Sequence, residues 1–167
     1  MNAMTIVWGW ENGLATMETR LWLPLPIASV FSFFADAENL ERLTPPRLRF
    51  HILTPRPIAM RVGSRIDYRL RLHGLPFRWQ SEITAWDPPR RFVDEQRRGP
   101  YKTWIHEHAF TERDGGTEVC DRVRYAVPGG WLIDRLAVRR DVKAIFAYRA
   151  ITLQKLSEGS FVQATNQ

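Results

Sequence analysis

The sequence predicts an α+β fold in which a seven-stranded antiparallel sheet wraps around one long C-terminal helix. Three observations support this prediction. Segments of alternating apolar and polar residues follow one another almost without interruption from residue 47 to residue 127, as strands with one buried face do. Two short helical segments lie ahead of this run. Residues 131–156 have apolar residues at helical spacing and no proline or glycine, so this helix can cover one face of the sheet.

The first predicted elements are a strand and two short helices. Residues 17–23 alternate, and Pro24 ends this strand. From residue 27 the apolar spacing becomes helical. Asp36 is a suitable N-cap for a second short helix, which the proline pair Pro45-Pro46 ends. Two short helices are therefore expected directly after the first strand.

Six further strands are expected, separated by turns that contain glycine or proline. Asp114-Gly115-Gly116 is the strongest hairpin signal among these turns. We expect one domain over residues 17–157, with residues 1–16 and 158–167 as flexible or peripheral tails. The six strands cover residues 47–52, 65–72, 77–86, 91–97, 102–111 and 117–127.

Length and composition indicate a single globular domain. The chain has 167 residues, of which 44% are hydrophobic and 25% charged. The single cysteine, Cys120, cannot form an internal disulfide, which favours a reducing compartment. No apolar run approaches the roughly 20 residues of a membrane span, and the N-terminal segment lacks the features of a signal peptide. We therefore expect a cytoplasmic protein.

The net charge of +6 raises the question of nucleic-acid binding. However, Arg65 and Arg69 alternate with apolar residues, which places them on the solvated outer face of a sheet. There Glu82, Glu95 and Glu107 could offset basic charge across strands. The usual helical and zinc motifs of nucleic-acid binding are absent from the sequence, so we expect no nucleic-acid partner. A module that docks on a protein or an anionic surface through these strands is a less favoured alternative.

One face of the strands between residues 75 and 128 carries an unusual mixture of side chains. If the strands pair as a meander, these side chains all point the same way. Indole, imidazole and carboxylate groups together are typical neither of a core nor of a solvated surface, so we expect them to line a pocket. The set consists of Trp79, Asp94, Gln96, Trp104, His106, His108, Asp121 and Tyr125.

This order of elements resembles the helix-grip fold of the START/polyketide-cyclase (SRPBCC) superfamily, which includes the birch-pollen allergens. The resemblance covers about residues 17–156. Within the superfamily, the chain is most similar to the bacterial cyclase/dehydrase-like branch. It implies a pocket for a hydrophobic ligand in a cytoplasmic protein, but no single reaction, because this fold hosts carriers, receptors and cyclases. The residues that carry it are Trp79, Ile83, Trp86, Pro89, Phe92, Asp94, Gln96, Gly99-Pro100, Trp104, His106, His108, Phe110, Gly115-Gly116-Thr117, Asp121, Tyr125, Pro128, Phe146 and Tyr148-Arg149.

His106 and His108 could bind a metal ion. Residues two apart on a strand share a face and lie about 6.5 Å apart along it, so both imidazoles can converge on one point. Asp121 or Asp94 could add a carboxylate ligand. Because a third ligand at diagnostic spacing is missing from the sequence, we expect no metal and no cofactor.

The same four residues could instead perform acid–base catalysis. A histidine suits proton transfer at neutral pH, and an aspartate can fix its tautomer. Cyclase and dehydratase reactions need enolisation and loss of water, which such a pair could assist. The candidate catalytic residues are therefore His106, His108, Asp94 and Asp121.

A third interpretation assigns no reaction to these residues, and the sequence favours it. Together with Gln96 and Tyr125 they can satisfy one another's hydrogen bonds in a polar patch that orients a ligand or holds the strands. Arg149 is either a solvated helix charge or a cavity residue that pairs with a ligand carboxylate or with Asp121. The nearby aromatic side chains either fill the core or form a slot for a ring-containing ligand. The candidate ligand-binding residues are Tyr68, Trp79, Phe92, Gln96, Trp104, Tyr125, Phe146 and Arg149.

The function expected from the sequence is binding or transport of a hydrophobic small molecule, lipid-like or polycyclic/aromatic, in an internal cavity. The alternative is a polyketide cyclase/dehydratase-type enzyme that uses a histidine–aspartate pair in that cavity. The sequence does not decide between a monomer and a homodimer.

Overall fold

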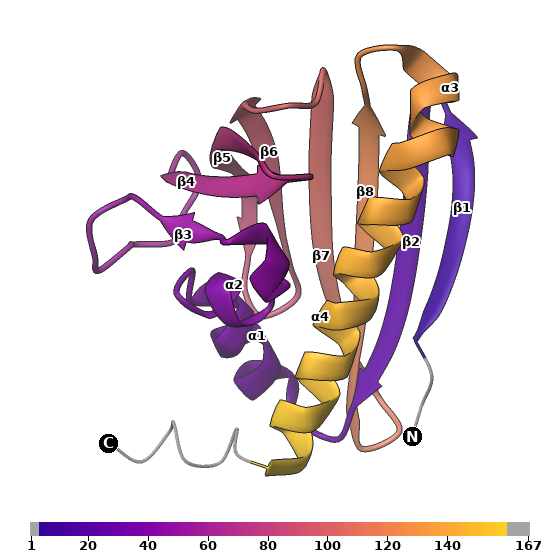
Figure 1. Cartoon of the computed structure of the whole chain (residues 1–167). Helices are drawn as coiled ribbons and strands as arrows, with labels where there is room; N and C mark the ends of the chain where they lie inside the picture. The colour runs from indigo at the N-terminus through magenta and orange to yellow at the C-terminus, as the bar shows by residue number, and fades with distance from the viewer. Residues whose placement is uncertain (1–3, 160–167) are drawn as a thin grey trace.

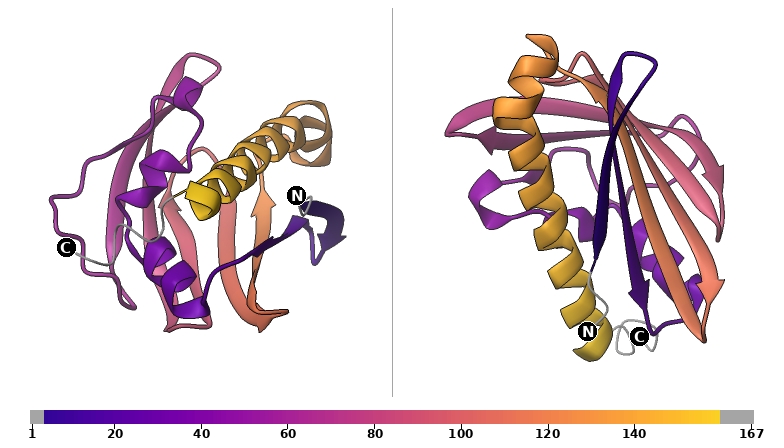
Figure 2. Two further views of the ribbon diagram at one scale, coloured as in Figure 1. Left: turned by 90° about the horizontal axis from the view of Figure 1, so that it is seen from below. Right: turned by 90° about the vertical axis from the view of Figure 1, so that its right-hand side faces the viewer.

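The computed structural model describes residues 4–159 and contains an antiparallel sheet with a long helix, α4, across it (Figure 1). All strands join one sheet in the order β1-β2-β8-β7-β6-β5-β4-β3, and every neighbouring pair is antiparallel. The sheet curves around α4, as the two views of Figure 2 show. The strands are β1 (Thr5–Glu11), β2 (Leu14–Leu23), β3 (His51–Ile52), β4 (Arg65–Leu72), β5 (Leu75–Asp87), β6 (Arg91–Arg98), β7 (Thr103–Arg113) and β8 (Gly116–Ala126).

The helices occupy two stretches of the chain. α1 and α2 follow β2 as the sequence predicts, and the last stretch runs along the concave side of the sheet (Figure 2). The helical elements are α1 (Ile27–Ala35), α2 (Asn39–Arg42), the 3-10 helix η1 (Pro46–Leu48), α3 (Gly130–Ile133), the π-helical segment η2 (Asp134–Val138) and α4 (Arg139–Gly159).

The sheet has eight strands rather than the seven predicted, because part of the expected N-terminal tail is a strand. β1 pairs with β2 along its whole length, from Thr5 opposite Arg20 to Glu11 opposite Leu14. The turn between them is Asn12-Gly13, and both residues have positive φ angles of 50° and 79°. This is the residue pair that two-residue hairpin turns prefer. The sequence signal was therefore present, and the first predicted strand begins at residue 14 rather than 17. Of the predicted C-terminal tail, residues 160–167 lie outside the described residues.

The strand predicted over residues 47–52 is mostly absent. The prolines at 45 and 46 instead open the 3-10 helix η1, and Arg49 at its end has a left-handed φ of 45°. A side chain in that conformation interrupts extended backbone. Only His51 and Ile52 then pair with β4.

The long C-terminal helix is predicted correctly in place but is not regular. Its first part contains the π-helical segment η2, a type of wide turn that is rare in proteins. Within it the Asp134 side chain is buried and accepts a hydrogen bond of 2.5 Å from the Tyr125 hydroxyl. This contact ties the start of the helix to β8.

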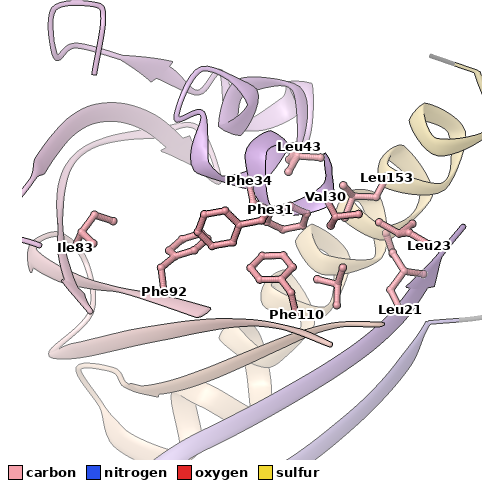
Figure 3. Close-up of a cluster of buried hydrophobic side chains, with 12 residues drawn as sticks. Leu21, Leu23, Val30, Phe31, Phe34, Leu43, Ile83, Phe92, Phe110 and Leu153 are labelled. Carbon is pink, nitrogen blue, oxygen red and sulfur yellow. The ribbon is translucent and has the colours of Figure 1, made fainter. Parts of the chain in front are cut away.

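The main hydrophobic cluster joins α1 to the sheet (Figure 3). Phe31 and Phe34 recur at helical spacing on α1 and point toward Phe92 and Phe110 from β6 and β7. The Phe34 and Phe110 ring centroids are 5.1 Å apart with nearly perpendicular planes, the favoured edge-to-face arrangement. This packing fixes α1 at one end of the space between the sheet and α4.

Acidic side chains offset the basic charge on the solvated face of the sheet, as the sequence suggests. Arg65 Nε lies 2.8 Å from a carboxylate oxygen of Glu82, and Arg91 Nε lies 3.1 Å from a carboxylate oxygen of Glu107. These pairs are exposed and each contributes little to stability. In the part of the chain that the structure describes, no helix has the length and apolar character needed to cross a membrane.

Candidate functional site

A cavity of about 180 Å³ lies between the concave face of the sheet and α4. Side chains from α1, α2, the strands β4 to β7 and α4 line it, and most of them are apolar or aromatic. An apolar cavity of about 150 Å³ holds one benzene molecule in another protein. The cavity therefore has room for a small molecule of one or two rings without any movement of its walls.

The polar end of the cavity comes from three neighbouring strands and α4. Asp94 on β6 is the register partner of His106 on β7, and His108 is the register partner of Asp121 on β8. Register partners place their side chains on the same face of a sheet, which brings all four to the concave side. Arg149 reaches the same point from α4 and is only 8% exposed, so the interpretation of Arg149 as a solvated helix charge is wrong.

Asp121 lies behind the two histidines rather than in the cavity lining. Its Oδ1 atom is 2.9 Å from His106 Nε2 and 2.9 Å from His108 Nδ1. The same oxygen is 3.6 Å from Arg149 Nη2. One carboxylate oxygen therefore faces three potential donors, and Asp121 is buried with them.

Asp94 completes the cluster from the cavity side. Its Oδ1 atom lies 3.2 Å from His108 Nε2 and 3.7 Å from His106 Nδ1. Its Oδ2 atom accepts a hydrogen bond of 3.3 Å from the Ser81 hydroxyl. Ser81 in turn accepts from Trp79 Nε1 at 3.1 Å and pairs with the Tyr68 hydroxyl at 2.9 Å. Hydrogen bonds thus connect the aromatic wall to the charged cluster.

The position of Asp121 determines where the histidines carry their protons. A carboxylate only accepts hydrogen bonds, so His106 Nε2, which lies 2.9 Å from Asp121, carries a proton, and a protonated His108 ring donates to Asp121 through Nδ1 and to Asp94 through Nε2. The Arg149 Nη2 atom is farther from His108 Nδ1, at 3.3 Å. The other nitrogens, His106 Nδ1 and His108 Nε2, therefore face Asp94.

The charges of the cluster balance within the protein interior. Burial opposes ionisation of Asp121, but the charge of Arg149 and the hydrogen bonds from both histidines hold its pKa well below the usual range. Burial also opposes ionisation of Asp94, yet its hydrogen bond with His108 and the nearby positive charges lower its pKa. Burial opposes the charged form of His108, but hydrogen bonds to Asp121 and Asp94 raise its pKa.

The pKa of His106 shifts in the opposite direction to that of His108. Burial lowers the pKa of His106, and so does the positive charge on His108. The consistent charge state is therefore two carboxylates balanced by Arg149 and a protonated His108, with His106 neutral. A buried cluster of this kind is stable only when its charges are paired and hydrogen-bonded.

Most of the predicted ligand-binding residues line the cavity, but two do not. Gln96 instead holds the following turn, donating to the Tyr101 carbonyl at 2.7 Å and accepting from the Tyr101 backbone N–H at 3.3 Å. The Tyr125 hydroxyl is engaged by Asp134. The predicted residues in the lining are Tyr68, Trp79, Phe92, Trp104, Phe146 and Arg149.

Sequence reasoning missed several residues of the site. Ser81 lies two positions after Trp79 on β5 and so shares its face, which the period of a strand could have shown. Tyr101 lies in a turn and has no periodic signal, yet its ring packs 4.6 Å from Trp104 in the lining. The apolar wall from α1 and α2, including Leu40 and Leu43, follows only from the tertiary packing.

Comparison with known proteins gives one family match and many structural ones. A family model described as "Polyketide cyclase / dehydrase and lipid transport" matches residues 23–146. No curated protein matches the chain. Similar solved structures include protein Ms6760 from Mycobacterium smegmatis, with 19% identity, a TM-score of 0.66 and coverage of 91% of this chain and 97% of the other.

Two further structures show the same likeness. The protein TTHA0849 from Thermus thermophilus is 19% identical, with a TM-score of 0.63 and coverage of 91% of this chain and 99% of that chain. Ara h 8.0201 is 18% identical, with a TM-score of 0.65 and coverage of 89% and 100% respectively. At these identities the likeness shows a shared fold.

Proposed function

The chain belongs to the polyketide cyclase/dehydrase and lipid transport family, and from this premise we propose that its cavity binds a compact hydrophobic molecule that carries one polar end. The observation that supports this proposal most directly is the cavity itself. It has apolar and aromatic walls, about 180 Å³ of space, and the Asp94–His106–His108 cluster at one end. Ligand pockets combine apolar walls with a few polar groups in this way.

The balance of the cluster supports recognition rather than reaction as the main role. Asp121 fixes both histidine rings from behind, and Asp94 is held by His108 and Ser81. A polar network that is already hydrogen-bonded is rigid, so it can orient a ligand at little cost in entropy. The apolar walls then provide the binding free energy, and the cluster selects the polar end.

Ligand size provides the test of this proposal. Metal-free protein is titrated with phenol, indole and 1-pyrenol in an isothermal titration calorimeter. The cavity volume predicts measurable binding of phenol and indole and much weaker binding of the four-ring pyrenol. Equal binding of all three would indicate adsorption to the surface, and no binding of phenol or indole would overturn the proposal. Native mass spectrometry of protein from its own host then identifies a co-purifying ligand.

An enzyme of cyclase or dehydratase type is the second candidate, and one observation favours it. His106 is kept neutral by burial and by His108, and its unprotonated Nδ1 atom faces the cavity end beside Asp94. A neutral imidazole can remove a proton next to a carbonyl group, the first step of enolisation. Turnover of a bound poly-β-keto compound that His106→Gln abolishes, with binding retained, would establish this role. Unchanged turnover in that variant would exclude it.

The cytoplasmic location and the lack of a nucleic-acid partner are inferred from the sequence, which leaves the oligomeric state open. The lone cysteine and the ion-paired outer arginines support the two inferences. Size-exclusion chromatography with light scattering distinguishes a monomer from a homodimer.

A further inference from the structure

Three potential metal-ligand atoms converge at the polar end of the cavity. Asp94 Oδ1 lies 3.2 Å from His108 Nε2 and 3.7 Å from His106 Nδ1. Potential ligand atoms of these three residues all lie within 4.8 Å of one another. The pairing of β6 with β7 places Asp94 directly opposite His106, although the two residues lie 12 positions apart in the chain.

Asp121 orients the two histidine rings. Because Asp121 Oδ1 faces His106 Nε2 and His108 Nδ1, the opposite ring nitrogens face Asp94, where each ring in its neutral form can offer a lone pair to a metal ion. Three acceptors at this separation repel one another unless a cation lies between them. In the protein without metal, a proton on His108 Nε2 supplies this positive charge.

We propose that Asp94, His106 and His108 form a binding site for a divalent transition metal ion with the ligand preference of zinc. Two imidazole nitrogens and one carboxylate oxygen are a ligand set that zinc accepts, and its fourth position would be open to the cavity. Ligand atoms about 2.0–2.1 Å from a tetrahedral ion are separated by about 3.4 Å. The two contacts of Asp94, 3.2 and 3.7 Å, lie on either side of this value.

Asp121 supplies the feature that distinguishes this arrangement from a chance cluster. Histidines that bind metals usually donate their other N–H to a carboxylate, which orients the ring and makes it a stronger ligand. Here one carboxylate does this for both rings, at 2.9 Å each. Arg149 Nη2 lies 3.6 Å from the same Asp121 oxygen and so places a positive charge beside it.

The charges also indicate what would occupy the fourth position. With the metal bound, the two carboxylates face the double charge of the ion and the single charge of Arg149. One positive charge remains in a buried site, so a hydroxide ion or a ligand with an anionic oxygen, such as a carboxylate or an enolate, would neutralise it. Neutral metal ligands such as imidazole also disfavour Mg²⁺ and Ca²⁺, which prefer oxygen.

The test uses the full-length chain without an affinity tag, freed of metal by chelation and titrated with Zn²⁺ and Co²⁺. We expect one equivalent to bind, with the visible absorption bands of tetrahedral cobalt. Asp94→Asn, a conservative change in a partly exposed side chain, and His106→Gln should each weaken Zn²⁺ binding at least tenfold. Asp121→Asn should weaken it by about 10–100-fold, as loss of a supporting carboxylate does.

His51→Gln and His73→Gln are the matched controls, because both histidines are exposed and neither lines the cavity. They should leave Zn²⁺ affinity unchanged, and circular dichroism checks that each variant is folded. The proposal is overturned if the folded wild-type protein binds no Zn²⁺ at micromolar concentration. It is also overturned if binding survives Asp94→Asn and His106→Gln unchanged. Because no cavity ligand is added, the result is independent of the phenol and indole titrations.

Discussion

Asp121 on β8 lies directly opposite His108 on β7 in the antiparallel ladder, and its Oδ1 atom is 2.9 Å from Nδ1 of that histidine. The same oxygen also faces His106 and Arg149. A residue that does not line the cavity therefore controls the orientation and charge of three residues that do. A substitution of Asp121 therefore tests how much the whole cluster contributes to stability.

Asp121→Asn should strongly destabilise the protein at pH 7. It removes the negative charge that balances Arg149 and His108 in the interior, and breaking a buried ion pair typically costs about 3–5 kcal/mol. Urea unfolding of both proteins measures the change. Glu82→Gln, which disrupts exposed pairs with Arg65 and Arg97, is the control and should have a much smaller effect. Equal losses in the two variants would contradict the prediction.

Arg149→Met should also destabilise the protein, and its effect should not add to that of Asp121→Asn. The double variant removes both opposite charges together, whereas each single variant leaves one without its partner. Coupling between contacting groups is typically about 0.5–3 kcal/mol. A double-mutant cycle from urea unfolding measures it, and strictly additive losses would show that Arg149 and Asp121 do not interact.

The two histidines should contribute to the pH dependence of stability with opposite signs. Burial lowers the pKa of His106, so its contribution is present above the ordinary pKa of about 6.5 and is lost as the pH falls. Hydrogen bonds to Asp121 and Asp94 outweigh burial and raise the pKa of His108. Its contribution is therefore present below about 6.5 and is lost as the pH rises through the folded pKa.

Unfolding free energies from pH 5 to pH 9 test these signs. His106→Gln should reduce the loss of stability on the acidic side, and His108→Gln should reduce the loss on the alkaline side. The same assignment requires that imidazole signals in nuclear magnetic resonance show His108 titrating at higher pH than His106. The reverse order would show that the charges are assigned to the wrong rings.

Val142→Phe should block the cavity while leaving the fold intact. Val142 on α4 is 1% exposed and lines the cavity, so a larger ring at this position would occupy ligand space. Binding of phenol and indole should fall at least tenfold in calorimetry. Leu136→Phe adds a ring nearby at a position that is 70% exposed and should leave binding unchanged. Retained binding in Val142→Phe would place the ligand elsewhere.

The sequence predicted those elements whose periodicity is strict. Arg65 to Leu72 alternates without a break and forms β4 over the same residues. The meeting of Asp94, His106, His108 and Asp121 also followed from the sequence, because consecutive strands in a meander bring such residues to one face. The fold and the composition of the polar end were therefore largely predictable.

Other features depend on tertiary contacts that a sequence pattern does not contain. By its position in the strand alternation Gln96 is expected to face the cavity, but its side chain forms hydrogen bonds with the backbone of Tyr101 in the following turn. Helical periodicity does not decide whether an arginine at the boundary of a face is buried, and Arg149 is buried because Asp121 provides a partner. The cavity volume likewise depends on how α1 and α2 pack.

The shared oxygen of Asp121 restricts which amino-acid substitutions the cavity can accept. The charges of Asp94, Asp121, His108 and Arg149 cancel only as a set, so replacing any one of them alone leaves an uncompensated charge in the interior. We therefore expect a single exchange at any of these positions to cost stability. Redesign of this pocket therefore has to begin with paired substitutions of opposite charge.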